Sequence, residues 1–264
     1  MPALHVHKHF QKVRKLSFCY LCGRTFEEGD EIDGDHVPPR AAFNARDRHP
    51  ALKLSTHKAC NASFSVQDRQ VAQLIAMRRR EYPKSPRDHA LEFVQYLGGL
   101  VALENLNVDA AIWRWIRGFH AALYQQPVPN GLQPVSIQTP FPRGEKTSSG
   151  GVAIRPILQQ HVLVVETIKR NRAAGNLDSI VAFNAKLRYE AVWCKADSGA
   201  VHASFFAVDI YDWKDLGSHT ADIPSRGCVG IYILPDGSVP EGAALDRSSP
   251  IAIPNRSLLD AFGD

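Results

Sequence analysis

Two pairs of metal-binding residue types stand at equal spacing near the start of the chain. Cys19-Tyr-Leu-Cys22 places two thiols on one tight turn, and His57-Lys-Ala-Cys60 supplies an imidazole and a third thiol 35 residues after Cys22. A closed tetrahedral zinc site is built from four ligands of this kind. We therefore predict a structural Zn²⁺ held by Cys19, Cys22, His57 and Cys60. The alternatives are cysteines that only pack in a core, or a redox pair.

The segment between the two half-sites carries a second set of polar residues. It contains Asp35-His36-Val37-Pro38-Pro39, and Asn61 directly follows the last predicted zinc ligand. Zinc would close this segment into a hairpin and bring Asp35, His36 and Asn61 together. Carboxylate and amide oxygens suit Mg²⁺ or Mn²⁺, and an imidazole can take a proton from water near neutral pH. These residue types are the parts of a one-metal phosphodiester hydrolase.

The order C-x-x-C, D-H-V-P-P and H-x-x-C-N resembles the HNH endonucleases of the ββα-metal fold, in the subset whose finger is braced by zinc. The resemblance covers residues 18 to about 70, roughly a quarter of the chain. It implies that His36 is the general base that activates water, and that Asp35 and Asn61 hold the catalytic Mg²⁺ or Mn²⁺. It also implies that the Cys and His half-sites hold the zinc that shapes the finger.

The sequence departs from that family at three places. His57 stands where the last zinc pair usually begins with cysteine, a change that imidazole chemistry tolerates. The middle asparagine, about nine residues before the final one, is replaced by Leu52, and Asn44 lies too early to substitute for it with certainty. The third position is Asn61 rather than His, which still offers a side-chain oxygen to a metal.

The resemblance also implies the substrate, which is nucleic acid, with DNA expected. Contacts to the phosphate backbone would give weakly sequence-specific cutting. The predicted contact residues are Arg40, Arg46, Arg48, Lys58, Arg78 and Arg79. A solvated helix face is the equally weighted alternative for these arginines. Cutting both strands with a one-metal site would be easiest for a homodimer.

Composition sets limits on the class of protein. The formal net charge is +4 and the pI is near 8.8, a mild basic bias concentrated in residues 1–90. This bias permits nucleic-acid binding. No apolar stretch approaches the roughly 18 to 20 residues of a membrane span, and the first 15 residues lack the apolar middle of a secretory signal. We therefore expect no membrane association and a cytoplasmic protein.

The pattern along the chain predicts an α+β protein in two parts. Residues 1–85 form the zinc-braced HNH finger, and residues 86–264 form an α+β domain with a helical start and a mainly antiparallel sheet. Apolar periodicity and β-branched or aromatic content guide the element predictions. Helices are expected at 65–81, 88–97, 109–124 and 177–185, and strands at 161–166, 187–194, 202–211 and 229–234.

Several other residues are interpreted as structural. His120 and His161 have no partner in the motif, and Cys194 and Cys228 lie in apolar runs that favour buried thiols. Trp115 and Phe119 are four apart on one helix face, which is typical of core packing.

Two other functions compete with the nuclease. The finger could be a non-catalytic zinc module that binds nucleic acid or protein without cutting, a reading that the adjacent Asp35 and His36 disfavour. The second domain could itself be an enzyme or a ligand sensor, although no phosphate loop or nucleophile elbow supports that. For the nuclease, a second domain that controls targeting, dimerisation or activation, and a role in restriction or phage defence, fit the architecture.

Overall fold

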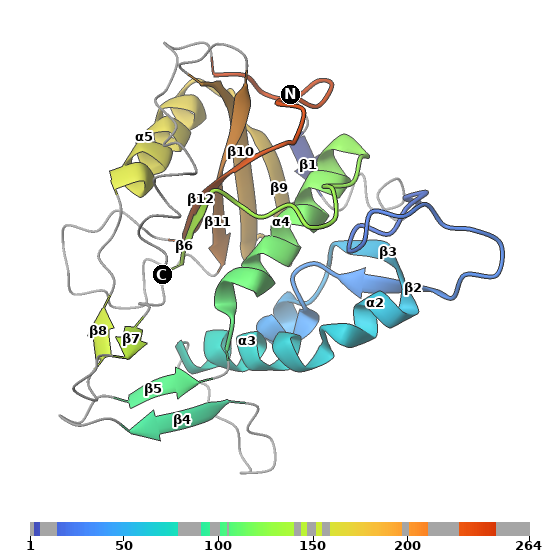
Figure 1. The fold of residues 1–264 in the computed structure, drawn as a ribbon, viewed down its shortest axis with the longest axis vertical. Helices are drawn as coiled ribbons and strands as arrows, with labels where there is room; N and C mark the ends of the chain where they lie inside the picture. The colour runs from blue at the N-terminus through green and yellow to red at the C-terminus, as the bar shows by residue number, and fades with distance from the viewer. Residues whose placement is uncertain are drawn as a thin grey trace.

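The computed structural model describes residues 3–5, 15–78, 91–95, 101–104, 106–139, 144–146, 152–154, 159–196, 201–210 and 227–246. They form a mixed α+β structure whose strands pair mainly antiparallel, in agreement with the predicted class (Figure 1). Within these residues no helix is both long and apolar enough to cross a membrane.

The D-H-V-P-P segment begins on a two-stranded hairpin. Strand β2 (Ile32–His36) pairs antiparallel with β3 (Lys53–His57), so that Asp35 lies opposite Leu54 and His36 opposite Lys53. The connection between them carries two short 3₁₀ turns, η1 (Arg40–Ala42) and η2 (Ala45–Asp47). Helix α2 (Lys58–Ser63) follows β3 directly, and helix α3 (Ser65–Arg78) confirms the helix predicted from residue 65.

A six-stranded sheet forms the larger part of the molecule. Its order is β1 (Ala3–His5), β9 (Asp178–Ala182), β10 (Leu187–Lys195), β11 (His202–Ile210), β12 (Cys228–Ile233) and β6 (Ser136–Gln138). Neighbouring strands are antiparallel except β1 and β9, which are parallel. Strands β10, β11 and β12 confirm three of the predicted strands.

Two helices cover opposite faces of this sheet. Helix α4 (Val108–Tyr124) shares a buried cluster with Trp193 of β10, whereas α5 (Gln159–Ala173) packs against the adjacent residues Val192 and Cys194. Side chains of consecutive strand residues point to opposite faces, which places the two helices on either side (Figure 1). The side chain of Asn107 caps α4 by accepting a hydrogen bond from the Ala110 backbone N–H at 3.0 Å.

Two small hairpins lie outside the six-stranded sheet. In the first, β4 (Glu92–Gln95) pairs antiparallel with β5 (Val101–Glu104). In the second, β7 (Gly144–Lys146) pairs antiparallel with β8 (Val152–Ile154).

Three element predictions were wrong. The helix predicted at 88–97 contains strand β4, and the helix at 177–185 contains strand β9, which is paired on both sides. In both segments the partner strand supplies backbone hydrogen bonds that local periodicity cannot reveal. The strand predicted at 161–166 is part of α5, where Val164, Val165 and Ile168 are buried at helical spacing while Val162 is exposed.

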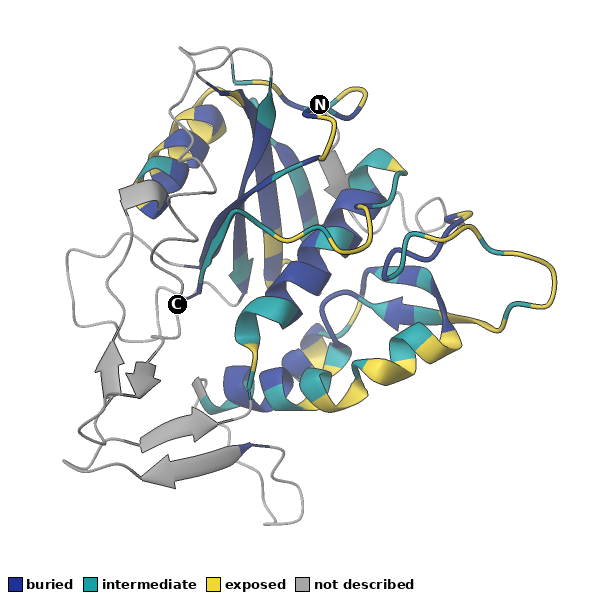
Figure 2. Ribbon diagram, in the orientation of Figure 1, coloured by how far each residue is buried: buried dark blue, intermediate teal, exposed yellow. Residues whose placement is uncertain are grey.

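One buried cluster runs from residues 15–78, which are called the finger below, through α4 to the sheet. It includes Tyr20, Val37 and Leu54 of the finger, Trp115 of α4 and Tyr189 of the sheet. Figure 2 shows this buried band continuing from the β2–β3 hairpin into α4. The predicted boundary near residue 85 lies outside the described residues, so the division into 1–85 and 86–264 stays a prediction.

Helix α4 approaches the D-H-V-P-P segment through a glycine. A Cβ built on Gly118 would lie 2.8 Å from Val37 Cγ1 and 3.2 Å from Tyr20 Cε2. Both neighbours are fully buried, and β-branched Val37 has little rotamer freedom to move away. The absence of a side chain at this position therefore sets how closely α4 packs on the finger.

We expect Gly118→Ala to lower the thermal melting temperature, although alanine is the better helix former. Overpacking a core costs about 1–3 kcal/mol, whereas the gain in helix propensity is about 1 kcal/mol. Calorimetry on the wild type and the variant measures the change. A variant at least as stable as the wild type would contradict the tight contact.

Candidate metal centre and adjoining site

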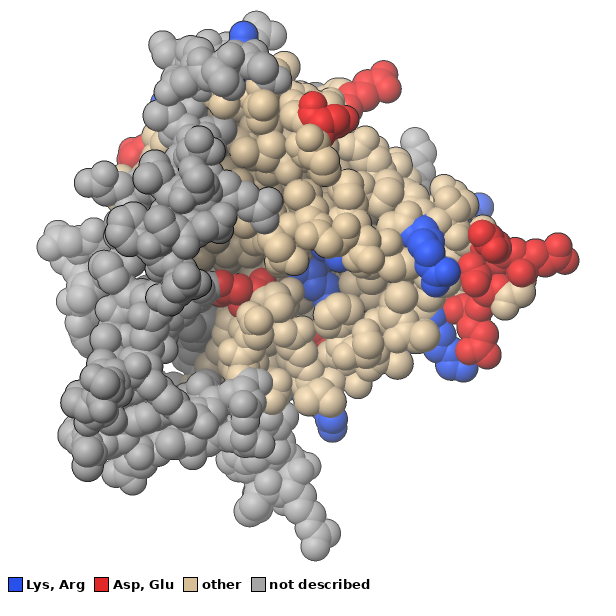
Figure 3. Space-filling model, viewed as in Figure 1, with Lys and Arg blue, Asp and Glu red and all other residues tan. Residues whose placement is uncertain are grey.

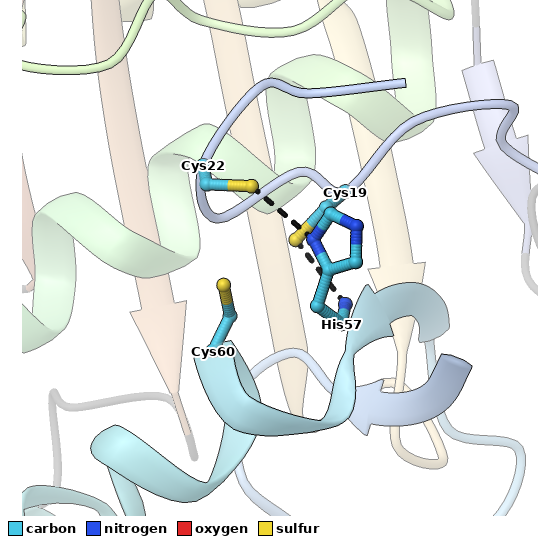
Figure 4. A group of neighbouring side chains, drawn as sticks. All are labelled: Cys19, Cys22, His57 and Cys60. Carbon is cyan, nitrogen blue, oxygen red and sulfur yellow. Dashed lines mark hydrogen bonds between the residues drawn. The ribbon is translucent and has the colours of Figure 1, made fainter. Parts of the chain in front are cut away.

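Four side chains converge where the N-terminal loop meets the end of β3. The ligand atoms of Cys19, Cys22, His57 and Cys60 all lie within 4.8 Å of one another, and the side chains point inward from two segments (Figure 4). In a tetrahedral zinc site with Zn–S bonds near 2.3 Å, neighbouring ligand atoms are about 3.8 Å apart. The four predicted ligands can therefore hold a metal ion such as zinc.

The local backbone explains why each pair faces the centre. The Gly23 N–H donates to the Cys19 carbonyl at 2.7 Å, and the Cys19 N–H donates to the Arg24 carbonyl at 2.8 Å, which folds the C-x-x-C segment into a tight turn. Gly23 closes that turn with φ 77°, a conformation that favours glycine. On the other side, His57 ends β3 and Cys60 lies in the first turn of α2, so the helix brings both to one side.

His57 is oriented by a carboxylate that the sequence interpretation missed. Its Nδ1 lies 3.3 Å from the Cys22 Sγ, and its Nε2 lies 3.1 Å from the Asp30 carboxylate. A hydrogen bond from Nε2–H to Asp30 leaves Nδ1 free of a proton and turned toward the metal position. The Glu27 backbone N–H first and His57 second lower the pKa of Asp30, which keeps it ionised. No motif marks Asp30, which is one of several acids in a loop.

Thiol electrostatics agree with a cationic occupant. Partial burial raises the pKa of Cys22, but hydrogen bonds with Arg24, Cys19 and His57 together outweigh it and lower the pKa to about 6. Burial, followed by the neighbouring Cys19 and Cys22 sulfurs, raises the pKa of Cys60 to about 12. Three thiolates this close therefore repel one another unless a cation lies between them, and Zn²⁺ is a cation that thiolate and imidazole ligands bind well.

Asp35 is buried in a network of charges and hydrogen bonds. Both the Tyr20 hydroxyl and the Arg114 guanidinium donate to its Oδ2, and a second nitrogen of Arg114 donates to Asp68. The Arg114 guanidinium also lies 4.7 Å from the centre of the Phe64 ring. Burial and the charge of Asp35 raise the pKa of Tyr20, so its hydroxyl remains a donor. Arg114 belongs to α4, a helix that no finger motif includes.

His36 lies on the opposite side of β2 from Asp35, because consecutive strand residues alternate. Its imidazole is half-buried among basic groups. Burial first, and then the charges of Arg40 and Lys53, lower the pKa of His36 to about 4, although Asp35 acts in the opposite direction. An imidazole with this pKa is uncharged near neutral pH and can accept a proton. Arg40 also lies 3.3 Å from His49, measured from Nη2 to Nε2.

Asn61 contacts an acid that the motif does not include. Its amide Nδ2 donates to Asp33 Oδ2 at 3.1 Å. Asp33 and Asp35 are two apart in β2 and so share a face of the strand. Asn61 therefore contacts Asp33 on the face of β2 that also carries Asp35, which is the face opposite His36. The spacing Asp33-Gly34-Asp35 was a usable signal for this pairing.

The residue in the place of the middle asparagine acts through its backbone. The carbonyl of Leu52 accepts a hydrogen bond from the Val37 N–H at 3.0 Å, directly after His36. Its side chain is fully buried. This backbone hydrogen bond fixes the segment after His36, so no asparagine side chain is needed at position 52 to hold it.

The predicted phosphate-contacting residues lie in different settings. Arg46 is 83% exposed, whereas Arg48 donates to the Phe43 carbonyl at 3.0 Å and so supports the loop. Lys58 is 65% exposed and lies 3.2 Å from Glu31, in the acidic loop that projects at one end of the molecule (Figure 3). Arg78 ends α3, but its side chain and the whole of Arg79 lie outside the described residues.

The residues interpreted as structural are buried. His120 in α4 is fully buried and lies 2.9 Å from the Tyr232 hydroxyl, and burial lowers the pKa of His120 to about 3. His161 is also buried, in α5. The Cys194 and Cys228 thiols, like Trp115 and Phe119, are buried in the two apolar clusters.

Comparisons with models of protein families, with curated proteins and with solved structures give no match to this chain. Any function must therefore be inferred from the side chains and their surroundings.

We expect Cys60→Ala to remove bound zinc and lower stability, because three remaining ligands leave the tetrahedral set incomplete. Cys228→Ala is the matched control, since it removes a buried thiol from β12 without touching the cluster. Zinc content per chain and thermal melting are measured for both. One zinc per chain in the Cys60 variant would contradict the assigned ligand.

Asp30→Ala should weaken zinc binding by about 10- to 100-fold without removing a ligand, because it frees the Nε2 side of His57. Competition with a chromophoric chelator measures the affinity. Glu28→Ala, in the same exposed loop, controls for the loss of negative charge. Equal affinities in the two variants would show that Asp30 does not orient His57.

Proposed function

We propose that this chain is a metal-dependent endonuclease of the HNH type that hydrolyses phosphodiester bonds, with DNA as its substrate and His36 as the general base. The observation that carries the proposal is the setting of His36. An uncharged imidazole lies among cationic side chains, one residue from a fixed buried carboxylate, on a hairpin and helix next to a Cys₃His cluster. This combination supplies a proton acceptor together with positive charge.

The basic groups around His36 are suited to a phosphate. Lys53 faces His36 across the hairpin, and Arg40 and His49 come from the connection that follows. Their positive charges disfavour a proton on His36 and attract a polyanion. Lys53 and His49 therefore join Arg40 as candidate substrate contacts. Arg46 and Lys58 would meet the backbone farther from the cut.

The chemistry proposed for His36 is removal of a proton from water. The proton passes to the imidazole, the water oxygen forms a bond to phosphorus, and the bond from phosphorus to the 3′-oxygen breaks. Asp35 and His36 leave the end of β2 on opposite faces, so a phosphate that meets both must lie across the end of the strand. A divalent Mg²⁺ or Mn²⁺ ion held by Asp35 and Asn61 would neutralise such a phosphate and the departing oxygen. Asp35 contributes a carboxylate whose orientation is set by Tyr20 and Arg114, and Asn61 a side-chain oxygen from α2.

The remaining expectations follow the same proposal. A homodimer would place two one-metal sites on the two strands of a duplex. Weak sequence preference follows from contacts to phosphates, and a role in restriction or phage defence suits such an activity. The protein would then meet its substrate in the cytoplasm. The described residues beyond α3 would help to position the site, since α4 reaches Asp35.

One observation favours a second candidate function, a non-catalytic zinc module that binds nucleic acid or protein. Asp35, the expected metal ligand, already accepts hydrogen bonds from Tyr20 and Arg114. If that network only stabilises the fold, the zinc cluster and basic surface would still support binding. Binding without cleavage would distinguish this candidate.

We expect His36→Ala to reduce cleavage by at least about 100-fold while leaving zinc content and melting temperature unchanged, because general-base catalysis contributes about 10²–10⁴. Zinc-loaded protein is incubated with plasmid DNA or RNA, with Mg²⁺ or Mn²⁺ or with neither. His202→Ala, a histidine of β11, is the matched control. Undiminished cleavage by the His36 variant would exclude His36 as the base. Binding without cleavage by the wild type would favour the zinc module.

A further inference from the structure

Among the described residues, both hydrogen bonds to the Asp35 carboxylate end on the same oxygen, Oδ2. Each carboxylate oxygen can accept about two hydrogen bonds. Oδ2 accepts one hydrogen bond from the Tyr20 hydroxyl and one from Arg114. These two bonds fill both acceptor positions of Oδ2. The two donors thereby hold the carboxylate in one rotation, with Oδ1 as the oxygen that remains for another ligand.

Two further contacts and the close packing of α4 restrict the Arg114 side chain. It pairs with Asp68 of α3 through a second nitrogen, and its guanidinium lies over the Phe64 ring. Gly118, one helical turn later on the same face of α4, brings the helix backbone against Val37. The side chain is 3% exposed, so its planar group has little freedom to turn.

The charges in this network do not balance. Asp35 and Asp68 contribute two negative charges, with side-chain exposures of 7% and 18%, and Arg114 contributes one positive charge. Tyr20 is a neutral donor. With both carboxylates ionised, one negative charge is left within a mostly buried group, which is costly in a medium of low polarity, and burial accordingly raises the pKa of Asp68. A divalent cation at the remaining oxygen of Asp35 would offset that charge.

We propose that Arg114 is a positioning residue for a divalent-ion site. From α4, it fixes Asp35, together with Tyr20, so that one carboxylate oxygen is directed to the ion. The proposal rests on the nuclease site proposed above but concerns ion binding. Arg114 does not touch the substrate or the reacting atoms. It connects the helix that packs on the six-stranded sheet to the candidate metal ligand of the finger.

The test measures binding of Mn²⁺ to zinc-loaded, full-length protein by the loss of the free Mn²⁺ signal in electron paramagnetic resonance. Asp35→Asn first identifies which bound Mn²⁺ depends on Asp35. Arg114→Met should then weaken that binding by about 10- to 100-fold, as removal of a residue that orients a metal ligand typically does. Arg114→Lys should recover only part of the affinity, because an ammonium group cannot reproduce the planar two-sided contact.

Two further variants guard against a folding defect. Tyr20→Phe keeps the buried ring and removes one donor to Asp35, so it should weaken Mn²⁺ binding less than Arg114→Met, by several-fold. Arg172→Met is the matched control, because it removes an arginine that pairs with Glu190 of β10 rather than with the finger. It should leave Mn²⁺ binding unchanged. Zinc content and circular dichroism are recorded for every variant.

The outcomes separate this proposal from the nuclease. If the wild type binds Mn²⁺ and the Arg114→Met variant does not, the positioning role is supported even if no nucleic acid is cut. Cleavage and Mn²⁺ affinity that both survive Arg114→Met overturn the positioning role and leave the nuclease standing. A wild type that binds no Mn²⁺ through Asp35, or a folded Arg114 variant that binds it more tightly, also overturns the positioning role.

Discussion

The buried pairing of Arg114 with Asp35 and Asp68 is the interaction on which the geometry of the finger depends. Removing three ionised groups from water is costly, and the cost is recovered only when the partners meet in good hydrogen-bonding geometry. That condition fixes β2, α3 and α4 relative to one another. Because the contacts are short-ranged, a shift of α4 would separate Arg114 from the buried carboxylate of Asp35 and the partly buried carboxylate of Asp68. The small size of Gly118 permits the close approach that the pairing requires.

Tyr20 connects the candidate zinc centre to this network. Tyr20 lies between Cys19 and Cys22, its ring is fully buried, and its hydroxyl reaches Asp35. Closing the C-x-x-C turn on a metal therefore also places a donor on the candidate catalytic carboxylate. Two arginines lie near the thiols. Arg24 hydrogen-bonds Cys22, and Arg117 of α4 lies near the thiols, although burial lowers the pKa of Arg117. Both would offset the excess negative charge of a Cys₃His site.

Contacts with the six-stranded sheet fix the position of α4, the helix that carries Arg114 and Arg117. On the side facing the sheet, His120 meets the Tyr232 hydroxyl, and Tyr124 donates to Asp178 at 2.7 Å. On the side facing the finger, Arg114 contacts Asp35 and Arg117 lies near the thiols of the candidate zinc centre. Gly118 on the same side packs against Val37 and Tyr20. Because α4 is packed on both sides, it cannot shift without disturbing its contacts with either the sheet or the finger. The part of the chain after the finger thus contributes to the geometry of the proposed site.

The sequence by itself determined the four residues of the candidate metal cluster, because their types and spacing are those of a tetrahedral site. It also determined helices α3 and α4 and strands β10, β11 and β12, whose periodicity or β-branched content is local. Only the tertiary structure decided that Asp30 orients His57, that Arg114 and Tyr20 hold Asp35, and that Asn61 contacts Asp33. It also decided that α5 is a helix and that β4 and β9 are strands. These outcomes depend on partners distant in the chain, and no local pattern records which distant residue will supply a charge, a hydrogen bond or a neighbouring strand.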